Sequence, residues 1–259
     1  MKITCIQMDM QFCAPEENFR KAAELMEKAM ENAPDVLVLP ELWNTGFFPQ
    51  DNLPTLCDRE GERVKKEFGA FAKSHNVNIV AGSVADLRHG KVYNTCYVFD
   101  RSGACIASYD KTHLFSPMGD DRYFTPGDRL CRFCLDGADC GVIICYDLRF
   151  PELTRAMAPL DILFLPAQWP DARISHLQTL CAARAIENQM FLVCCNSCGH
   201  AGDTTFGGCS AIIDPLGNVL AQAGTEETEI SVKTDLSQLT NIRNSINVFA
   251  DRRPELYRM

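Results

Sequence analysis

The sequence lacks the features of membrane-spanning, secreted and nucleic-acid-binding proteins. No apolar stretch approaches the ~20 residues that a membrane-spanning helix needs. The first ten residues alternate like a strand and do not form the apolar core of a signal peptide. No block of Lys and Arg occurs, and 34 acidic residues against 25 basic ones give a formal net charge of -9. Because nucleic-acid binding needs a concentrated basic surface, we expect neither a nucleic-acid partner nor a membrane partner.

Internal repeats, low-complexity tracts and linkers rich in Pro, Gly or Ser are also missing. We therefore expect a single domain over residues 1–259, long enough to bury a substantial core. Cysteine, by contrast, is plentiful, with 14 residues. That many cysteines without a secretory signal indicate free thiols in a reducing compartment, so we expect a cytoplasmic protein.

Strand and helix patterns alternate at both ends of the chain around a strand-rich middle. Apolar residues at helical spacing predict helices over 15–32, 59–75 and 171–188, and a short helix from Pro151. Strands are expected at 1–9, 35–40, 77–85, 91–100, 104–110, 129–135, 139–145, 161–167 and 190–196, with further strands between 207 and 234. A long loop is expected from Phe115 to Asp128. The pattern favours α/β layers in which helices cover packed sheets.

Cys145 is the candidate nucleophile among the 14 cysteines. It ends the apolar strand Gly-Val-Ile-Ile-Cys, and the residues that follow turn into a helix at Pro151. A side chain at a sharp strand-to-helix turn points outward, and the next backbone N–H groups converge near the helix N-terminus. That environment lowers a thiol pKa and supplies donors for an oxyanion. The alternative is a small buried hydrophobic residue, as cysteines most often are.

A nucleophilic thiol also needs a base. None of the five histidines lies in a Cys/His protease motif, and for His113 a structural hydrogen bond is the favoured interpretation. Glu41 follows the buried strand at 35–40, and Lys111 follows the strand at 104–110. A solvated carboxylate and a surface lysine are the alternative interpretations of these two residues.

Three segments together resemble the signatures of the nitrilase, or carbon–nitrogen hydrolase, superfamily. The segments are Pro40-Glu41-Leu42, Tyr109-Asp110-Lys111-Thr112-His113-Leu114-Phe115 and Cys145-Tyr146-Asp147-Leu148-Arg149-Phe150-Pro151. Their order and spacing also match, and the resemblance runs from Met1 to about Tyr257. Ala167-Gln168-Trp169-Pro170 and Arg173 are most similar to the bacterial ω-amidase branch, which acts on 2-oxoglutaramate and related ω-amides of dicarboxylates.

The resemblance implies a fold, an assembly and a set of roles. The fold is a four-layer αββα sandwich, and the assembly is a homodimer or higher homo-oligomer that joins through helices and the C-terminal segment. Glu41 is the implied base, Cys145 the nucleophile, and Lys111 with the backbone N–H of Tyr146 the implied oxyanion hole. No metal and no organic cofactor are required, and the partner is a small-molecule amide.

One departure from the family pattern concerns a fourth acid. Many members carry a second glutamate between the lysine and the cysteine, and the matching position here holds Asp120, one methylene shorter. Its reach toward Lys111 or substrate is therefore open, and a solvated loop carboxylate is the alternative.

Candidate substrate-binding residues surround these signatures. Arg173 and Arg149 are available for a remote carboxylate, which arginine binds in a bidentate manner. Pairing of Arg149 with Asp147 or Glu152 is the favoured alternative for that residue. The candidate apolar walls are Trp43, Phe47, Trp169 and Phe206, each of which could equally be core.

Other functions stay open. The same machinery serves N-carbamoyl amide hydrolysis, nitrile hydrolysis and acyl transfer to an amine. A catalytically silent binding protein is a rival from another class, although all three reactive residues are present. A zinc-binding or redox protein is another, because Cys131–Cys134 and Cys195–Cys198 are Cys-x-x-Cys pairs. Their separation far exceeds the ~15–20 residues usual between two such pairs in zinc sites.

Overall fold

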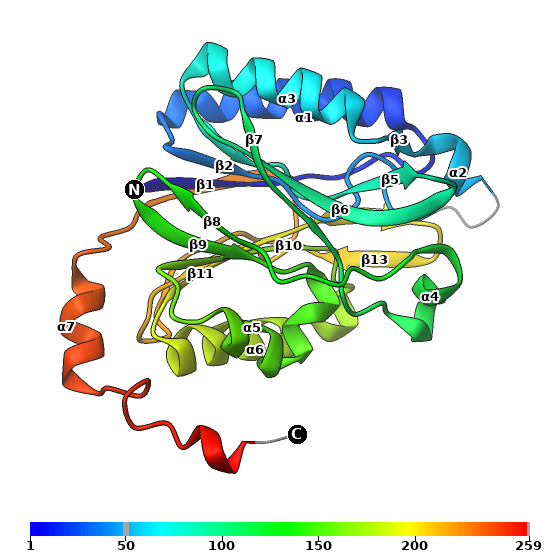
Figure 1. Cartoon of the computed structure of the whole chain (residues 1–259). Helices are drawn as coiled ribbons and strands as arrows, with labels where there is room; N and C mark the ends of the chain where they lie inside the picture. Colours follow the sequence, from blue (N-terminus) through cyan, green and yellow to red (C-terminus); the bar gives the residue numbers. More distant parts are fainter. Residues whose placement is uncertain (49–51, 258–259) are drawn as a thin grey trace.

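Two β-sheets pack face to face, and helices cover the outer face of each sheet (Figure 1). The computed structural model describes residues 1–48 and 52–257. Between the sheets lies an apolar core that includes Val38, Val98, Val142 and Phe164. Two further apolar cores lie on the outer sides of the sheets, one between each sheet and the helices that cover it. These layers form the expected αββα sandwich, which is confirmed.

The first sheet is mixed, and α1 (Pro15–Ala29) and α3 (Glu62–His75) cover it. Its strand order is β16 (Thr228–Lys233), β1 (Lys2–Gln7), β2 (Val36–Val38), β4 (Asn78–Val80), β6 (Lys91–Phe99), β5 (Val84–Arg88) and β3 (Asp58–Arg59), and β7 (Cys105–Asp110) also pairs with β6. β1, β2 and β4 run parallel because α1 and α3 carry the chain back between them. The short helices η1 (Met30–Asn32) and α2 (Leu53–Leu56) complete this half.

The second sheet has the order β15 (Val219–Gln222), β14 (Ala211–Ile213), β11 (Phe191–Asn196), β10 (Ile162–Ala167), β9 (Ala138–Val142) and β8 (Arg132–Leu135). Its outer face is covered by α5 (Pro151–Met157) and α6 (Ile174–Asn188). β10 and β11 are buried throughout, as strands covered on both faces must be. A separate hairpin, β12 (Cys198–Ala201) and β13 (Thr204–Gly207), lies beyond β11.

Three expected elements differ from the structure. The strand predicted at 77–85 is two strands, β4 and β5, because the chain turns at Gly82 with a left-handed φ of +62°. The loop from Phe115 to Asp128 contains the helical turns η2 (Ser116–Met118) and α4 (Asp120–Tyr123). The predicted helix at 171–188 starts as the 3₁₀ turn η4 (Asp171–Arg173) before α6.

The C-terminal part leaves the sandwich. After β16 the chain forms α7 (Gln238–Ser245) and η5 (Pro254–Leu256), which extend past the edge of the two sheets (Figure 1). Neither helix was predicted, because neither has a continuous apolar face. Among residues 1–48 and 52–257, no helix has both the length and the apolar character to cross a membrane.

Candidate active site

A cavity of about 480 Å³ opens where strand ends from both sheets meet. Glu41 follows β2 and Lys111 follows β7 in the first sheet, whereas Cys145 follows β9 and Gln168 follows β10 in the second. The Glu41 backbone N–H donates to the carbonyl of Ala167 at 3.3 Å, which joins the two sets of strand ends. The lining residues are Glu41, Leu42, Phe47, Phe48, Lys111, Phe115, Met118, Asp120, Cys145, Tyr146, Arg149, Gln168, Trp169, Pro170 and Arg173.

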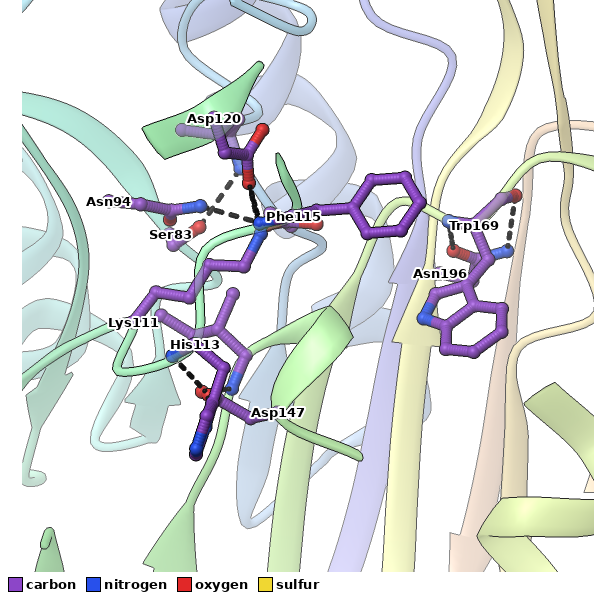
Figure 2. A network of polar contacts seen from close by, with 12 residues as sticks. Ser83, Asn94, Lys111, His113, Phe115, Asp120, Asp147, Trp169 and Asn196 are labelled. Atoms are coloured by element: carbon purple, nitrogen blue, oxygen red, sulfur yellow. Dashed lines mark hydrogen bonds and ion pairs between the residues drawn. The ribbon is translucent and has the colours of Figure 1, made fainter. Parts of the chain in front are cut away.

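Lys111 lies between two carboxylates. Its Nζ is 2.9 Å from Glu41 Oε1 and 2.8 Å from Asp120 Oδ2, and all three side chains are almost fully buried (Figure 2 shows the lysine and Asp120). Burial alone disfavours the ammonium, but Glu41 and Asp120 outweigh it and hold the pKa of Lys111 well above its usual value. The lysine therefore provides a fixed positive charge at the wall of the cavity.

Cys145 begins the 3₁₀ turn η3 (Cys145–Arg149) with a left-handed φ of +48°. This is uncommon for a side chain larger than glycine and is typical of functional sites. Burial and the nearby Glu41 carboxylate, to which the thiol also hydrogen-bonds, raise the pKa of Cys145 well above its usual value. Lys111 and a backbone hydrogen bond from Gln168 act in the opposite direction. The expectation that the strand-to-helix turn lowers the thiol pKa is therefore wrong, because burial and Glu41 outweigh the two lowering effects.

The Glu41 carboxylate is held from two sides. Asn94 on β6 donates from Nδ2 to Oε1 at 2.8 Å, and Lys111 reaches the same oxygen. The turn that carries Glu41 is closed by Ser83, whose Oγ accepts the Leu42 N–H at 3.0 Å (Figure 2). Sequence reasoning missed Asn94, because an amide in the middle of a strand has no signal of its own.

Asp120 reaches Lys111 despite its shorter side chain. The short helix α4 places the residue, and the backbone N–H of Phe115 donates to Oδ2 at 3.1 Å. Only 5% of Asp120 is exposed. The alternative of a solvated loop carboxylate is therefore wrong.

Asp147, in the turn after Cys145, hydrogen-bonds to His113. The backbone N–H of His113 donates to Oδ1 at 2.9 Å, and its ring nitrogen Nδ1 lies 2.9 Å from the same oxygen. The ring also stacks on Phe150. The favoured structural interpretation of His113 is confirmed.

Four of the six candidate substrate-binding residues line the cavity: Phe47, Arg149, Trp169 and Arg173. Trp43 does not, which corrects the prediction. Its indole lies in the core between α1, α3 and the first sheet, stacks on Phe68 and donates to the carbonyl of Ala81. Phe206 does not line the cavity either, because it packs behind Phe47, 5.7 Å between ring centroids.

Arg149 does not pair with Asp147 or Glu152, so the favoured alternative for this residue is wrong. Its guanidinium lies over the Trp169 ring, 4.6 Å from the centroid, and contacts His176. Arg173 lies over the Phe115 ring at 5.3 Å. Among the described residues, neither arginine forms an ion pair with a carboxylate. Two uncompensated cations therefore line the cavity wall.

Most of the other lining residues lie in the segments that carry the family resemblance. Leu42, Phe115 and Pro170 form apolar walls with Phe48 and Met118, and Tyr146, the candidate oxyanion donor, lines the cavity directly after Cys145. Gln168 is 5% exposed, and its side-chain amide has no hydrogen-bond partner among the described residues. Within residues 1–48 and 52–257, no three His, Cys, Asp or Glu side chains are grouped so that they could hold a metal ion.

Comparison with known proteins agrees with this geometry. Residues 2–244 match the family model described as carbon-nitrogen hydrolase. The 2-oxoglutaramate amidase of Bacillus subtilis is 44% identical over 257 residues, which cover 98% of each chain. The omega-amidase NIT2 of Xenopus tropicalis is 31% identical over 93% of this chain and 91% of its own.

A solved structure is also similar. A variant of the amidase from Nesterenkonia sp. AN1 is 25% identical, with a TM-score of 0.87 over 99% of this chain and 98% of its own. In that protein acrylamide has added to the active-site cysteine. The family match spans residues 2–244, and the two relatives cover 98% and 93% of the chain. The chain is therefore an enzyme of the carbon–nitrogen hydrolase family.

Proposed function

We propose that the protein is an ω-amidase that hydrolyses the terminal carboxamide of a dicarboxylate monoamide, such as 2-oxoglutaramate, and releases ammonia. One observation carries this proposal. A buried ammonium, Lys111, lies between two carboxylates, next to a thiol that hydrogen-bonds to one of them. The same cavity contains Arg149 and Arg173, which form no ion pair with any carboxylate in the part of the chain that the structure describes.

The first half of the reaction forms a thioester. Glu41 accepts the thiol proton while the sulfur of Cys145 attacks the amide carbon. The ammonium of Lys111 and the backbone N–H of Tyr146 hold the negative oxygen of the tetrahedral intermediate. Removal of one such donor typically lowers kcat by about 10²–10³-fold. Protonated Glu41 then gives its proton to the nitrogen, the C–N bond breaks and ammonia leaves.

The second half releases the acid. Glu41 deprotonates a water molecule, and the hydroxide attacks the thioester carbon while the same donors hold the oxygen. The C–S bond breaks, and the sulfur recovers a proton from Glu41. The raised pKa of Cys145 supports a role for this base, because a thiol that stays protonated must lose its proton as it attacks.

The arginines support a substrate with an anionic remote end. A carboxylate that enters the cavity finds guanidinium groups held over aromatic rings, which leaves their N–H donors free for a bidentate contact. The relatives described as 2-oxoglutaramate amidase and omega-amidase support the same class of substrate.

A substrate panel tests the assignment. We expect ammonia release from 2-oxoglutaramate to exceed that from an N-carbamoyl compound and from a simple nitrile at equal concentration, with no release by Cys145→Ser. Preference for the carbamoyl compound or the nitrile would reject the ω-amidase assignment, but the proposed thioester mechanism would still stand. Absence of ammonia from every compound would instead support a binding protein.

A second comparison isolates the arginines. Arg173→Met should raise KM for the carboxylate-bearing amide by about 10–100-fold, the value of a charged hydrogen bond, and leave an uncharged primary amide almost unaffected. Arg149→Met should act in the same direction. Equal losses on both amides would show that the arginines support the fold and not the substrate.

We also propose that residues 1–259 act as one catalytic domain in the cytoplasm and assemble as a homodimer. All 14 cysteines are free, which supports a reducing compartment. The C-terminal segment supports the dimer, because Ile246 and Leu256 are each 66% exposed on a segment that leaves the sandwich. Light scattering should give twice the chain mass for the full chain and the chain mass for residues 1–245. A monomeric full chain would reject the dimer.

A further inference from the structure

We propose that Asp147 is a positioning residue for the reaction. Its carboxylate holds the segment that carries Lys111 against the turn that carries Cys145 (Figure 2). The proposal rests on the roles of Lys111 and Cys145 in the proposed function, and it adds a residue that touches neither substrate nor the reacting atoms.

On the nucleophile side, Asp147 closes the turn around Cys145. The Ile144 N–H donates to Asp147 Oδ2 at 3.0 Å, and the Asp147 N–H donates to the Ile144 carbonyl at 3.0 Å. These reciprocal bonds join Ile144 and Asp147, the two residues that directly flank Cys145 and Tyr146. They hold Cys145 in its left-handed conformation, which a side chain larger than glycine adopts only when its surroundings impose it.

On the lysine side, the same carboxylate holds both flanks of Lys111. The Tyr109 hydroxyl donates to Oδ2 at 2.7 Å, and the His113 N–H donates to Oδ1 at 2.9 Å. Tyr109 and His113 stand two residues before and two residues after Lys111. The lysine backbone is thereby fixed at two points to the group that fixes the nucleophile turn.

The chemistry of the donors requires a carboxylate at this position. Asp147 has 0% exposure and, among the described residues, pairs with no lysine or arginine. Its two oxygens receive N–H and O–H donors from both segments. An asparagine of equal shape would turn its NH₂ group either toward the two His113 nitrogens or toward the Ile144 N–H and the Tyr109 hydroxyl, and could no longer accept an N–H donor on that side.

The consequence for the reaction is geometric. Lys111 must meet the oxygen that forms when Cys145 attacks, and the two residues come from different sheets. A misplacement of about 1 Å between a reacting atom and its stabilising group can cost about 10²-fold in rate. Asp147 links the two segments through hydrogen bonds, and it lies only two residues from Cys145.

Asp147→Asn tests this, with Asp86→Asn as the matched control. Asp86 is equally buried and likewise accepts a tyrosine hydroxyl, that of Tyr97 at 2.7 Å, and a backbone N–H, that of Gly61 at 2.9 Å. Unlike Asp147, it also pairs with Arg88, 3.1 Å away. We expect both variants to lose similar amounts of stability in urea. Asp147→Asn alone should lower kcat by about 10²-fold, with KM changed less than about threefold. Equal kcat values for the two variants would overturn the proposal.

The alkylation rate of Cys145 by iodoacetamide, read by peptide mass spectrometry, gives a readout independent of turnover. Asp147→Asn should slow it, because the ammonium no longer faces the sulfur. Lys111→Ala has no ammonium left to position. Adding Asp147→Asn to that variant should therefore slow the alkylation of Cys145 less. Equal slowing in both backgrounds would overturn the link to Lys111. If Cys145→Ser were fully active, the proposed function itself would fail, which is a distinguishable result.

Discussion

At the scale of single residues, the site depends on the buried ammonium of Lys111, which interacts with two carboxylates and a thiol. Lys111 contacts Glu41 and Asp120 and lowers the pKa of Cys145, against the larger effects of burial and Glu41. The two carboxylates keep the lysine charged, and the lysine in turn makes two nearby buried carboxylates tolerable. Loss of any one member therefore leaves the others in a different electrostatic environment.

Asp120→Asn is the residue-scale test of this balance. The raised pKa of Lys111 depends in part on Asp120, so the variant should lower that pKa and move the alkaline limb of kcat/KM to lower pH. We also expect kcat to fall at least about tenfold, since the oxyanion donor is less firmly held. Asp120→Glu keeps the charge and should retain more activity than Asp120→Asn.

The matched control is Asp121→Asn, which removes a carboxylate from the next, exposed position of the same helical turn. An unchanged pH profile in Asp120→Asn, or an equal change in both variants, would contradict the role given to Asp120.

Sequence reasoning identified the three reactive residues at the cavity, but not which neighbouring side chains point into the cavity and which point into the core. Glu41, Lys111 and Cys145 each follow a strand, and side chains at strand ends often line a site. Trp43 also follows such a strand, two residues after Glu41, yet it packs into the core because its turn closes on Ser83. Which side of a turn a residue takes depends on a partner distant in sequence, and no local pattern contains that information.

At the scale of elements, tight turns between strands hold the cavity together. Gly82 breaks β4 from β5 with φ +62°, and a Cβ there would lie 2.1 Å from the carbonyl oxygen of Pro40. Pro40 directly precedes Glu41, so the turn at Gly82 supports the carboxylate. The sequence predicted one continuous strand over 77–85, because apolar residues continue on both sides of the glycine.

Gly82→Ala should consequently damage both stability and activity. A left-handed alanine costs about 1–3 kcal/mol, and the clash must also move Pro40 or the glycine turn. We expect a lower thermal midpoint together with a lower kcat. Gly90→Ala is the control, because Gly90 has a similar φ of +77° but open space around its Cβ position. If both variants lost stability and kept full kcat, the turn would have no influence on Glu41.

The αββα layering was predictable from alternating patterns together with the family resemblance, whereas α4 and α7 were not. α4 has four residues and follows a glycine, too short for any helical period to appear. Its position nevertheless decides whether Asp120 reaches Lys111. Short elements near a site can determine where its side chains lie, yet they are too short to be predicted from sequence periodicity.

At the scale of the whole molecule, the buried thiols make the free energy of unfolding decrease at alkaline pH. Burial raises the pKa of Cys96 and Cys195 well above the usual value, and raises that of Cys57 to about 12. A hydrogen bond with Cys181, together with burial, raises the pKa of Cys194 in the same way. In the unfolded chain these thiols ionise near their ordinary pKa of 9.0. Above that pH the unfolded state holds fewer protons than the folded state, so stability falls as pH rises.

Urea unfolding at pH 8 and pH 10, with reductant present, measures this dependence. We expect the free energy of unfolding to be lower at pH 10. Cys96→Ala should reduce the loss between pH 9 and 10 by up to about 1 kcal/mol, because one ionising thiol is removed. Equal stability at the two pH values would contradict the burial of these thiols.

The central claim is that substrate carbon bonds to the sulfur of Cys145 during turnover. Rapid acid quench of the enzyme with a dicarboxylate monoamide, followed by peptide mass spectrometry, tests it most directly because it separates 14 cysteines. The account predicts a mass gain equal to the amide less ammonia on the peptide that contains Cys145, and none in Cys145→Ala. The same mass on another cysteine, or ammonia release by the Cys145→Ala enzyme at the native rate, would contradict it.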